Sequence, residues 1–196
     1  MTTPERGPGI DTSMIEDLYR QLLKALGQDP GSAHLRDTPR RAAAFWAEFL
    51  GPPPASTDTT FAFEGSGSDL AAVSGIGAWT VCQHHLLPFH VTVAAAYVPA
   101  GKIIGLSKIA RIVARHAAAL QVQEALTCQV ATSLATTTGS PAVGAWVTGE
   151  HLCMLMRGTR ATGARASTQT LLGTAATDPA TERRLHAAAH PPTGGP

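Results

Sequence analysis

The chain has 196 residues, and its 15 basic and 14 acidic side chains give a formal net charge of +1 with neutral histidines. Hydrophobic residues make up 44% of the chain, which is enough for a core and excludes disorder throughout. The near-zero net charge argues against nucleic-acid binding, because neutralising phosphates requires a basic excess or a basic face.

Cysteine content and apolar runs indicate where the protein resides. Three cysteines are too few for a disulfide framework, so we expect a reducing cytoplasm. Residues 1–11 lack the apolar core of a signal peptide, and no apolar run reaches the ~18 residues that cross a bilayer. Charged residues form only 15% of the chain, below the roughly 25% of typical soluble domains, which favours a large interface between subunits.

Residues 1–60 are predicted to form a loose tail and a helical appendage. Ser13 and Glu16 make a capping-box pattern, and apolar residues then recur at helical spacing as far as Leu26. A second helix is expected from Thr38 to residue 50, with a proline in its first turn. The small polar residues of 56–69 indicate an exposed loop.

Residues 61–178 are predicted to form an α+β domain with an antiparallel sheet and a helix pair on one face. Strands are expected at residues 70–81, 89–98, 102–106, 142–148 and 151–157. Ser107 is placed to cap one helix of the pair, and the second runs from Val122 to Gly139. Residues 179–196 are expected to form a short helix and a disordered tail.

Two short segments offer metal ligands. Cys82 and His85 have a Cys-x-x-His spacing at the end of a strand, and alternation along the strand at 151–157 would turn His151 and Cys153 to one face. Cys82, His85 and Cys153 would leave a fourth position open for water, as in catalytic zinc sites. Buried cysteines are also common as small apolar residues, and spacing alone does not show that residues 82 and 153 meet.

The neighbouring histidines and a basic helix start add further candidates. His84 and His151 lie beside the expected ligands and can serve in proton transfer. Lys108 and Arg111 follow Ser107 in the first turns of its helix, where the helix dipole favours an anion such as phosphate. A solvated charged helix face is the alternative explanation for this stretch.

Four segments together resemble the signature segments of the GTP cyclohydrolase I family, in order and in spacing. They are residues 82–89 (CQHHLLPF), 105–113 (GLSKIARIV), 121–124 (QVQE) and 151–158 (HLCMLMRG). The resemblance covers about residues 11–185. It implies the tunnelling fold and a toroidal homodecamer with active sites between subunits. It also implies the conversion of GTP and water to formate and 7,8-dihydroneopterin triphosphate, the first step of tetrahydrofolate and pterin biosynthesis.

The resemblance also implies a role for each matched residue. The family's zinc ligands match Cys82, His85 and Cys153, and its proton-transfer histidines match His84 and His151. Ser107 matches a hydroxyl near the ribose, and Gln123 and Glu124 match the pair that recognises guanine. The residues that bind the triphosphate match Lys108, Arg111 and Arg157. Arg41 matches a further arginine of the family. Opening the purine imidazole ring requires water, a proton and a buried acceptor for guanine, and these side chains can supply them.

Departures from the family pattern keep alternatives open. Gln83 stands where a glutamate is usual beside the first cysteine, and Ala44 stands where a lysine is common. Gly77 and Ala78 replace an acidic and an aromatic residue. A specialised paralogue with another product or pathway, for a deazapurine or a secondary pterin, is one alternative. A catalytically silent subunit that binds a purine or pterin is the other.

Overall fold

A computed structural model describes residues 9–51 and 59–192 of the chain. The chain divides into two compact units, Met1–Pro52 and Pro53–Pro196, which are described separately. The predicted loose tail before residue 9 and the predicted disorder of residues 193–196 lie outside the described residues. The domain boundaries expected at residues 60 and 178 stay predictions.

The first unit contains the two expected helices, α1 (Thr12–Ala25) and α2 (Thr38–Phe49). They pack against each other, and the indole N–H of Trp46 donates to the hydroxyl of Tyr19 at 2.8 Å. Asp37 precedes the first residue of α2, so the helix starts with Thr38 inside it and Pro39 in the first turn. Proline suits this position because the first turn has no backbone acceptor for its missing N–H.

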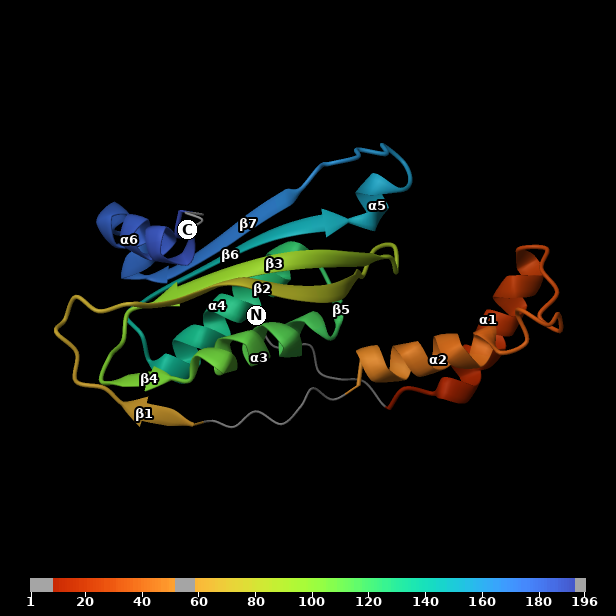
Figure 1. The fold of residues 1–196 in the computed structure, drawn as a ribbon, viewed down its shortest axis with the longest axis horizontal. Coiled ribbons are helices and arrows are strands. Elements are labelled where there is room, and N and C mark those ends of the chain that lie inside the picture. Colours follow the sequence, from red (N-terminus) through yellow and green to blue (C-terminus); the bar gives the residue numbers. More distant parts are fainter. Residues whose placement is uncertain (1–8, 52–58, 193–196) are drawn as a thin grey trace. The chain divides into compact units, whose positions relative to one another are not determined.

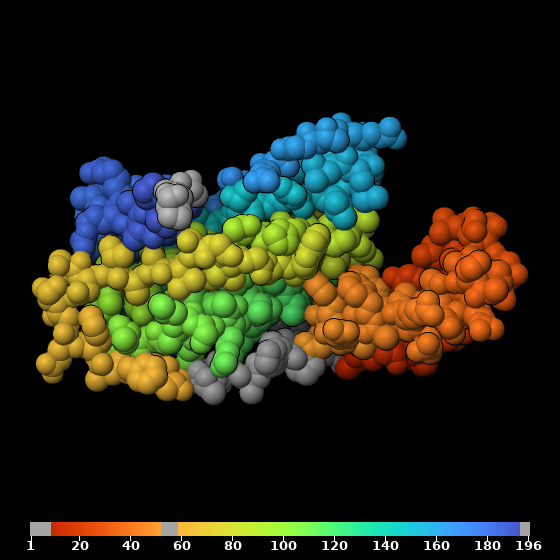
Figure 2. Space-filling view, viewed as in Figure 1, coloured from red at the N-terminus to blue at the C-terminus, as the bar shows by residue number. Residues whose placement is uncertain are grey.

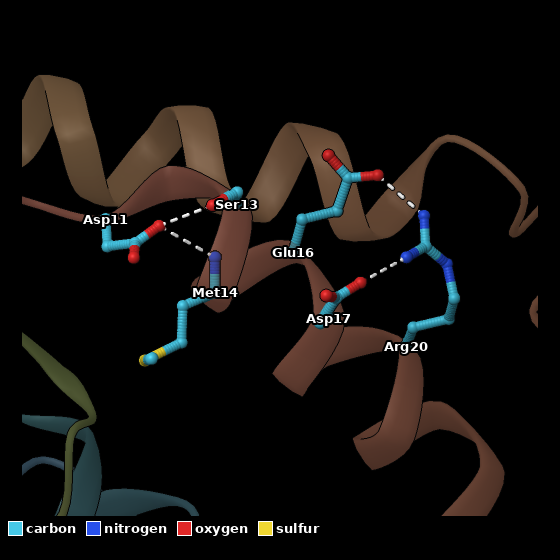
Figure 3. A network of polar contacts seen from close by, with 6 residues as sticks. All are labelled: Asp11, Ser13, Met14, Glu16, Asp17 and Arg20. Atoms are coloured by element: carbon cyan, nitrogen blue, oxygen red, sulfur yellow. Dashed lines mark hydrogen bonds and ion pairs between the residues drawn. The ribbon is translucent and has the colours of Figure 1, made fainter.

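The start of α1 differs from the prediction (Figure 3). Asp11 is the N-cap: its carboxylate accepts from the backbone N–H of Met14 at 2.9 Å and from the hydroxyl of Ser13 at 2.6 Å. The capping box centred on Ser13 is therefore wrong. The charged carboxylate two residues earlier is the stronger acceptor, which leaves Glu16 free to pair with Arg20 one turn later at 2.6 Å.

The second unit is built on a five-stranded sheet of order β5-β2-β3-β6-β7, with a separate two-stranded sheet of β1 and β4. All the pairs are antiparallel except β2 with β5. The strands are β1 (Thr60–Ala62), β2 (Ala71–Cys82), β3 (Pro88–Tyr97), β4 (Lys102–Ile104), β5 (Leu120–Gln121), β6 (Ala142–His151) and β7 (Ala166–Gly173).

Helices cover both faces of the large sheet, as Figure 1 shows. One face carries α3 and α4, and the opposite face carries α6. The helices of this unit are α3 (Leu106–Ala117), α4 (Gln123–Thr138), α5 (Leu152–Leu155), the 3₁₀ turn η1 (Thr174–Ala176) and α6 (Pro179–Ala189). The prediction of an α+β fold with a helix pair on an antiparallel sheet is confirmed. None of the helices in the described ranges has the length and apolar character that a bilayer crossing requires.

Strand alternation separates two apolar clusters. The odd-numbered residues of β3 from Phe89 to Tyr97 are buried with apolar side chains of α3 and α4. Ala94 and Ala96 point to the other face, where they pack with Leu185 and Ala189 of α6. The sequence already showed this period-two alternation on β3. One face of the strand packs against α3 and α4, and the other packs against α6.

Several predicted elements need correction. The loop at residues 56–69 contains β1, and β5 and β7 were not predicted. The strand predicted at 151–157 is wrong: β6 ends at His151 and α5 follows. His151 is the last residue of β6 with a partner on β3, so the chain beyond it satisfies its backbone in a helical turn, with Met156 N–H donating to the Leu152 carbonyl. The N-cap of α3 is Gly105, and Ser107 lies inside the helix.

Candidate metal and catalytic site

Three candidate ligands meet at one end of the sheet. Cys82 is the last residue of β2, His85 lies in the following turn, and Cys153 lies in α5. One ligand atom from each lies within 4.8 Å of the other two, and the Cys82 Sγ is 3.6 Å from His85 Nδ1. The structure therefore brings together the two segments whose meeting the sequence alone left open.

Cys153 lies close to Cys82 for a different structural reason than the sequence analysis expected. His151 and Cys153 do not share a strand, because α5 begins at Leu152. Instead, β6 pairs with β3 so that His151 lies opposite Phe89, next to the turn that carries His85. The single turn of α5 then folds Cys153 back toward Cys82. The three residues meet as the sequence analysis expected, while the shared strand face given as the reason was wrong.

The donor chemistry of the cluster fits a divalent, thiolate-binding ion. Two sulfur atoms and one imidazole nitrogen are ligands that zinc accepts in tetrahedral sites, and three protein ligands leave one position for water or substrate. Burial, followed by the neighbouring Cys82, raises the pKa of the Cys153 thiol, while the charge of Arg157 lowers it. A divalent cation between the sulfur atoms would favour both thiolates, since it offsets these two costs.

His151 is held in one orientation beside the cluster. Its ring stacks on Phe89, with ring centroids 4.1 Å apart and planes 13° from parallel. Its Nε2 lies 2.8 Å from the Oε1 of Gln123. The Gln123 amide nitrogen lies 3.1 Å from the carbonyl oxygens of Val147 and Ala166, which can only accept. Gln123 Oε1 is therefore the acceptor for His151, so the hydrogen of neutral His151 lies on Nε2 and Nδ1 carries the lone pair.

Gly149 makes room for this pair. It lies two residues before His151 on β6, and a Cβ there would overlap Gln123 Oε1 and come within 3.2 Å of His151 Nε2. Any side chain at this position would displace the Gln123 amide. A glycine is therefore required here by close approach of side chains, not by its backbone angles.

Ionisable groups lie near the cluster, and some of them change the pKa values of their neighbours. Burial lowers the pKa of His151, and the nearby charge of Glu124 partly offsets this by raising it. Glu124 is exposed in the first turn of α4, where a negative charge is favourable. His84 is exposed in the turn after Cys82, with Nδ1 4.0 Å from the Cys82 sulfur. His151, His84 and Arg157 are thus ionisable side chains that lie near the candidate ligands.

The helix α3, which carries three candidates, starts at the other end of the sheet. Ile104, just before α3, donates its N–H to the hydroxyl of Tyr97, which pairs with Ala71, the first residue of β2. Cys82 is the last residue of that strand, about 35 Å along it at the rise of an extended chain. Ser107 and Lys108, in the first turn of α3, therefore begin at the end of the sheet away from the ligands of the same chain, and Lys108 is only 5% exposed.

Arg41 belongs to the first unit, on α2, where its guanidinium lies 3.4 Å from the Asp37 carboxylate. Sequence reasoning missed the roles of Phe89 and Gly149. Phe89 was legible only as an apolar strand residue, because its contact with His151 depends on the register of β3 with β6. A glycine amid strand-like residues was the one available signal for Gly149.

Comparisons with known proteins address the chain as a whole. The family model described as GTP cyclohydrolase I matches residues 15–190. The GTP cyclohydrolase 1 of Hyperthermus butylicus is 45% identical over 151 residues, which are 77% of this chain and 77% of the relative. That of Alkalilimnicola ehrlichii is 39% identical over 174 residues, 87% of this chain and 94% of the relative.

One solved structure also overlaps the chain. It is the apo form of the archaeosine synthase QueF-Like, with a TM-score of 0.45 and 13% sequence identity. The overlap covers 56% of this chain and 97% of that chain. At this TM-score the likeness carries no argument about function.

Proposed function

We propose the following function from the premise that the chain belongs to the GTP cyclohydrolase I family. The chain is an enzyme of that type, and its substrate is GTP. It opens the imidazole ring of the purine at C8 with water and releases formate. The product is 7,8-dihydroneopterin triphosphate, at the entry to pterin and tetrahydrofolate biosynthesis.

Cys82, His85 and Cys153 would hold the metal ion, which we propose to be zinc. The observation that carries the proposal is the convergence of these ligand atoms within 4.8 Å, next to the Gln123–His151 pair. When bound, the ion supplies the Lewis acidity that makes water a nucleophile at neutral pH. Phe89 supports the site because its ring stacks on His151 and fixes the plane of that ring.

His151 is the proposed proton donor to N7 of the purine. Its Nε2–H is committed to Gln123, so the proton that moves must be carried on Nδ1. Because burial lowers the pKa of His151, its cationic form gives up that proton readily. His84, exposed on the turn between two ligands, is the second proposed proton carrier.

Glu124 is the proposed acceptor for the N–H groups of guanine. Its carboxylate is exposed beside His151, whereas the Gln123 side chain is 2% exposed and uses its oxygen and nitrogen inside the chain. We therefore assign the Gln123 side chain to positioning His151 and leave base recognition to Glu124. Adenine presents no matching donors, so a carboxylate that becomes enclosed around the bound base would be left without partners.

The triphosphate clamp is proposed to join two copies of the chain. Arg157 lies close enough to the cluster for its charge to lower the pKa of Cys153. Ser107 and Lys108 start α3 at the opposite end of the sheet, and we propose that a second copy brings its Ser107, Lys108 and Arg111 to the ligands of the first. This supports a homo-oligomer with active sites between subunits, of which the decamer is the form we propose. The cytoplasmic location stays a prediction.

The test is turnover of GTP by protein loaded with zinc, with formate measured enzymatically and the product identified by mass. Formate and 7,8-dihydroneopterin triphosphate in equal amounts are expected. A ring-opened formamide or a cyclic phosphate would identify instead a specialised paralogue. Protein that holds zinc and releases no formate from GTP would contradict the proposed reaction.

A further inference from the structure

The short strand β5 brings Gln121 against the turn that carries two of the candidate ligands. Gln121 pairs with Cys82, the last residue of β2, in the parallel ladder of the two strands. Its backbone carbonyl accepts a hydrogen bond at 3.0 Å from the N–H of Gln83, the next residue along the chain. Gln121 belongs to segment 121–124, which resembles the family, yet it takes no part in the proposed reaction.

The side chain of Gln121 is held by two hydrogen bonds. Its amide nitrogen donates to the backbone carbonyl oxygen of His116 at 2.8 Å and to the Oε1 atom of Gln129 at 2.7 Å. The carbonyl oxygen of His116 can only accept, so the nitrogen of the amide must face it, and both amide hydrogens are used. Gln121 is only 3% exposed, so water does not compete for these bonds.

The bond to His116 ties Gln121 to the end of α3. The carbonyl of His116 is among the last four of the helix, which have no partner within it. The acceptor is a backbone atom, so this bond does not depend on the side chain of Gln129. Figure 2 shows the green atoms of α3 directly beside the yellow atoms of β2. Gln121 therefore links the ligand turn to a helix that is itself packed on the sheet.

The turn after Cys82 depends on such an attachment. The N–H of Cys82 donates to the carbonyl of Leu87 at 2.8 Å, and the carbonyl of Cys82 accepts from the N–H of Leu86 at 2.8 Å. Leu86 has a φ of 52°, a left-handed conformation that is unfavourable for a residue with a Cβ. Strained backbone persists only where its surroundings hold it in place. The bond to Gln121 supplies this hold at Gln83, between the two ligands of the turn.

We propose that Gln121 is a positioning residue for the metal site. It fixes the backbone between Cys82 and His85, and so keeps the Cys82 Sγ and the His85 Nδ1 at their separation of 3.6 Å. The inference rests on the proposed zinc site and adds to it a residue that is not a ligand. Residues that orient metal ligands from outside the ligand set commonly change metal affinity or activity by about 10–100-fold.

The experiment compares Gln121→Met with Ser133→Ala. Methionine keeps the length of glutamine and removes both donors. Ser133→Ala removes the hydroxyl that lies 2.8 Å from His116 Nε2, so it weakens the contact between α3 and α4 and leaves the bonds of Gln121 in place. Competition with a chelator measures the zinc affinity, and the absorption spectrum of protein loaded with Co²⁺ reports the geometry of the site.

Gln121→Met should bind zinc about 10–100-fold more weakly than wild type, with a changed Co²⁺ spectrum, and Ser133→Ala should match wild type in both. Hydrogen exchange tests the turn without any metal. In metal-free Gln121→Met, the amides of residues 83–87 should exchange at least about tenfold faster than in wild type. If Gln121→Met does not fold, Gln121→Asn takes its place with the same expected direction, because its amide is one methylene shorter.

Wild-type zinc affinity and a wild-type Co²⁺ spectrum in folded Gln121→Met would overturn the proposal. An equal loss of zinc affinity in Ser133→Ala would also overturn it, since general loosening of the helix pair would then be the cause. None of these measurements uses GTP. Zinc-loaded wild type that releases no formate would therefore contradict the proposed reaction and leave the role of Gln121 standing.

Discussion

The Oε1 atom of Gln123 on α4 accepts a hydrogen bond from Nε2–H of His151 at the end of β6, at 2.8 Å. The pair joins a helix to the sheet beside the candidate metal ligands. Because the Gln123 nitrogen is bound to two carbonyl oxygens, the amide cannot turn over, and the histidine keeps one tautomer. The orientation of the proposed acid is therefore set by a residue that lies outside the metal ligand set.

Replacing Gln123 with leucine should lower kcat about 100-fold with zinc content unchanged, since loss of orientation at a reacting group has effects of this size. The KM for GTP should change little if Gln123 positions His151 and does not read the base. Turnover and KM are measured on zinc-loaded protein. Gln129→Leu, on the same helix, is the matched control and should retain activity; a raised KM with normal kcat in Gln123→Leu would restore base recognition to Gln123.

Gly149→Ala tests the same pair from the other side. The added methyl overlaps Gln123 Oε1, so we expect overpacking to lower the free energy of unfolding by about 1–3 kcal/mol, together with a fall in kcat. Chemical denaturation and turnover measure the two effects. Gly77→Ala on β2 meets only the flexible His90 ring at 3.3 Å and serves as the control. Full activity of Gly149→Ala would contradict the assigned role of the Gln123–His151 bond.

Cys153→Ser should abolish metal binding and turnover together. Removing one of three protein ligands leaves a site too weak to hold zinc through purification, and formate release should fall below about 1% of wild type. Metal content by elemental mass spectrometry and formate release are compared in the same sample. Cys128→Ser, on α4 and outside the cluster, should retain both; full zinc and full turnover in Cys153→Ser would refute the ligand assignment.

Two inactive variants should rescue each other if the site joins two copies. Arg111→Ala damages the phosphate end and Cys153→Ser damages the metal end, so a mixed oligomer contains some sites with both ends intact. Random mixing in equal amounts gives about a quarter of the sites intact when each is built from two neighbours. Co-expression with separate tags measures this recovery. Cys153→Ser mixed with His85→Gln should give none, and no recovery in the first mixture would place the whole site in one chain.

His116 should make the fold sensitive to acid. Burial, followed by the charge of Arg115, lowers the pKa of His116 below its usual value of 6.5, while the ring nitrogen Nε2 lies 2.8 Å from the Ser133 hydroxyl. The unfolded chain therefore takes up the proton first. The stabilising contribution is complete above the unfolded pKa and is lost as pH falls through the folded one.

The urea concentration at the unfolding midpoint of wild type should accordingly decrease as the pH is lowered from roughly 7.5 to roughly 5.5. His116→Gln keeps a group able to bond Ser133 and should reduce this fall. Some of it should persist, because burial lowers the pKa of His151 with the same sign. His34→Gln, at an exposed position of the first unit, is the control and should follow wild type. Equal falls in wild type and His116→Gln would remove His116 as a source of the acid sensitivity.

The sequence by itself determined the family and pointed to Cys82, His85 and Cys153 as candidate ligands. The alternation on β3 and the helical spacing on α3 and α4 are local patterns. Such patterns can be recognised in a segment without knowing which other segments it packs against. Residue type and spacing also singled out His84, His151, Lys108 and Arg111, and the family resemblance added Gln123, Glu124, Arg157 and Arg41. The strands β5 and β7 escaped notice, since a two-residue strand and a half-polar strand carry little periodic signal.

The tertiary structure decided how these residues meet. The register of β3 with β6 places His151 on Phe89, and the loss of a strand partner after His151 turns the chain into α5 and returns Cys153 to Cys82. Pairing across strands depends on the whole sheet, so no local pattern encodes it. For the same reason, only the fold shows that α3 starts with Ser107 and Lys108 at the end of the sheet away from the ligands, although the sequence presents both segments as parts of one site.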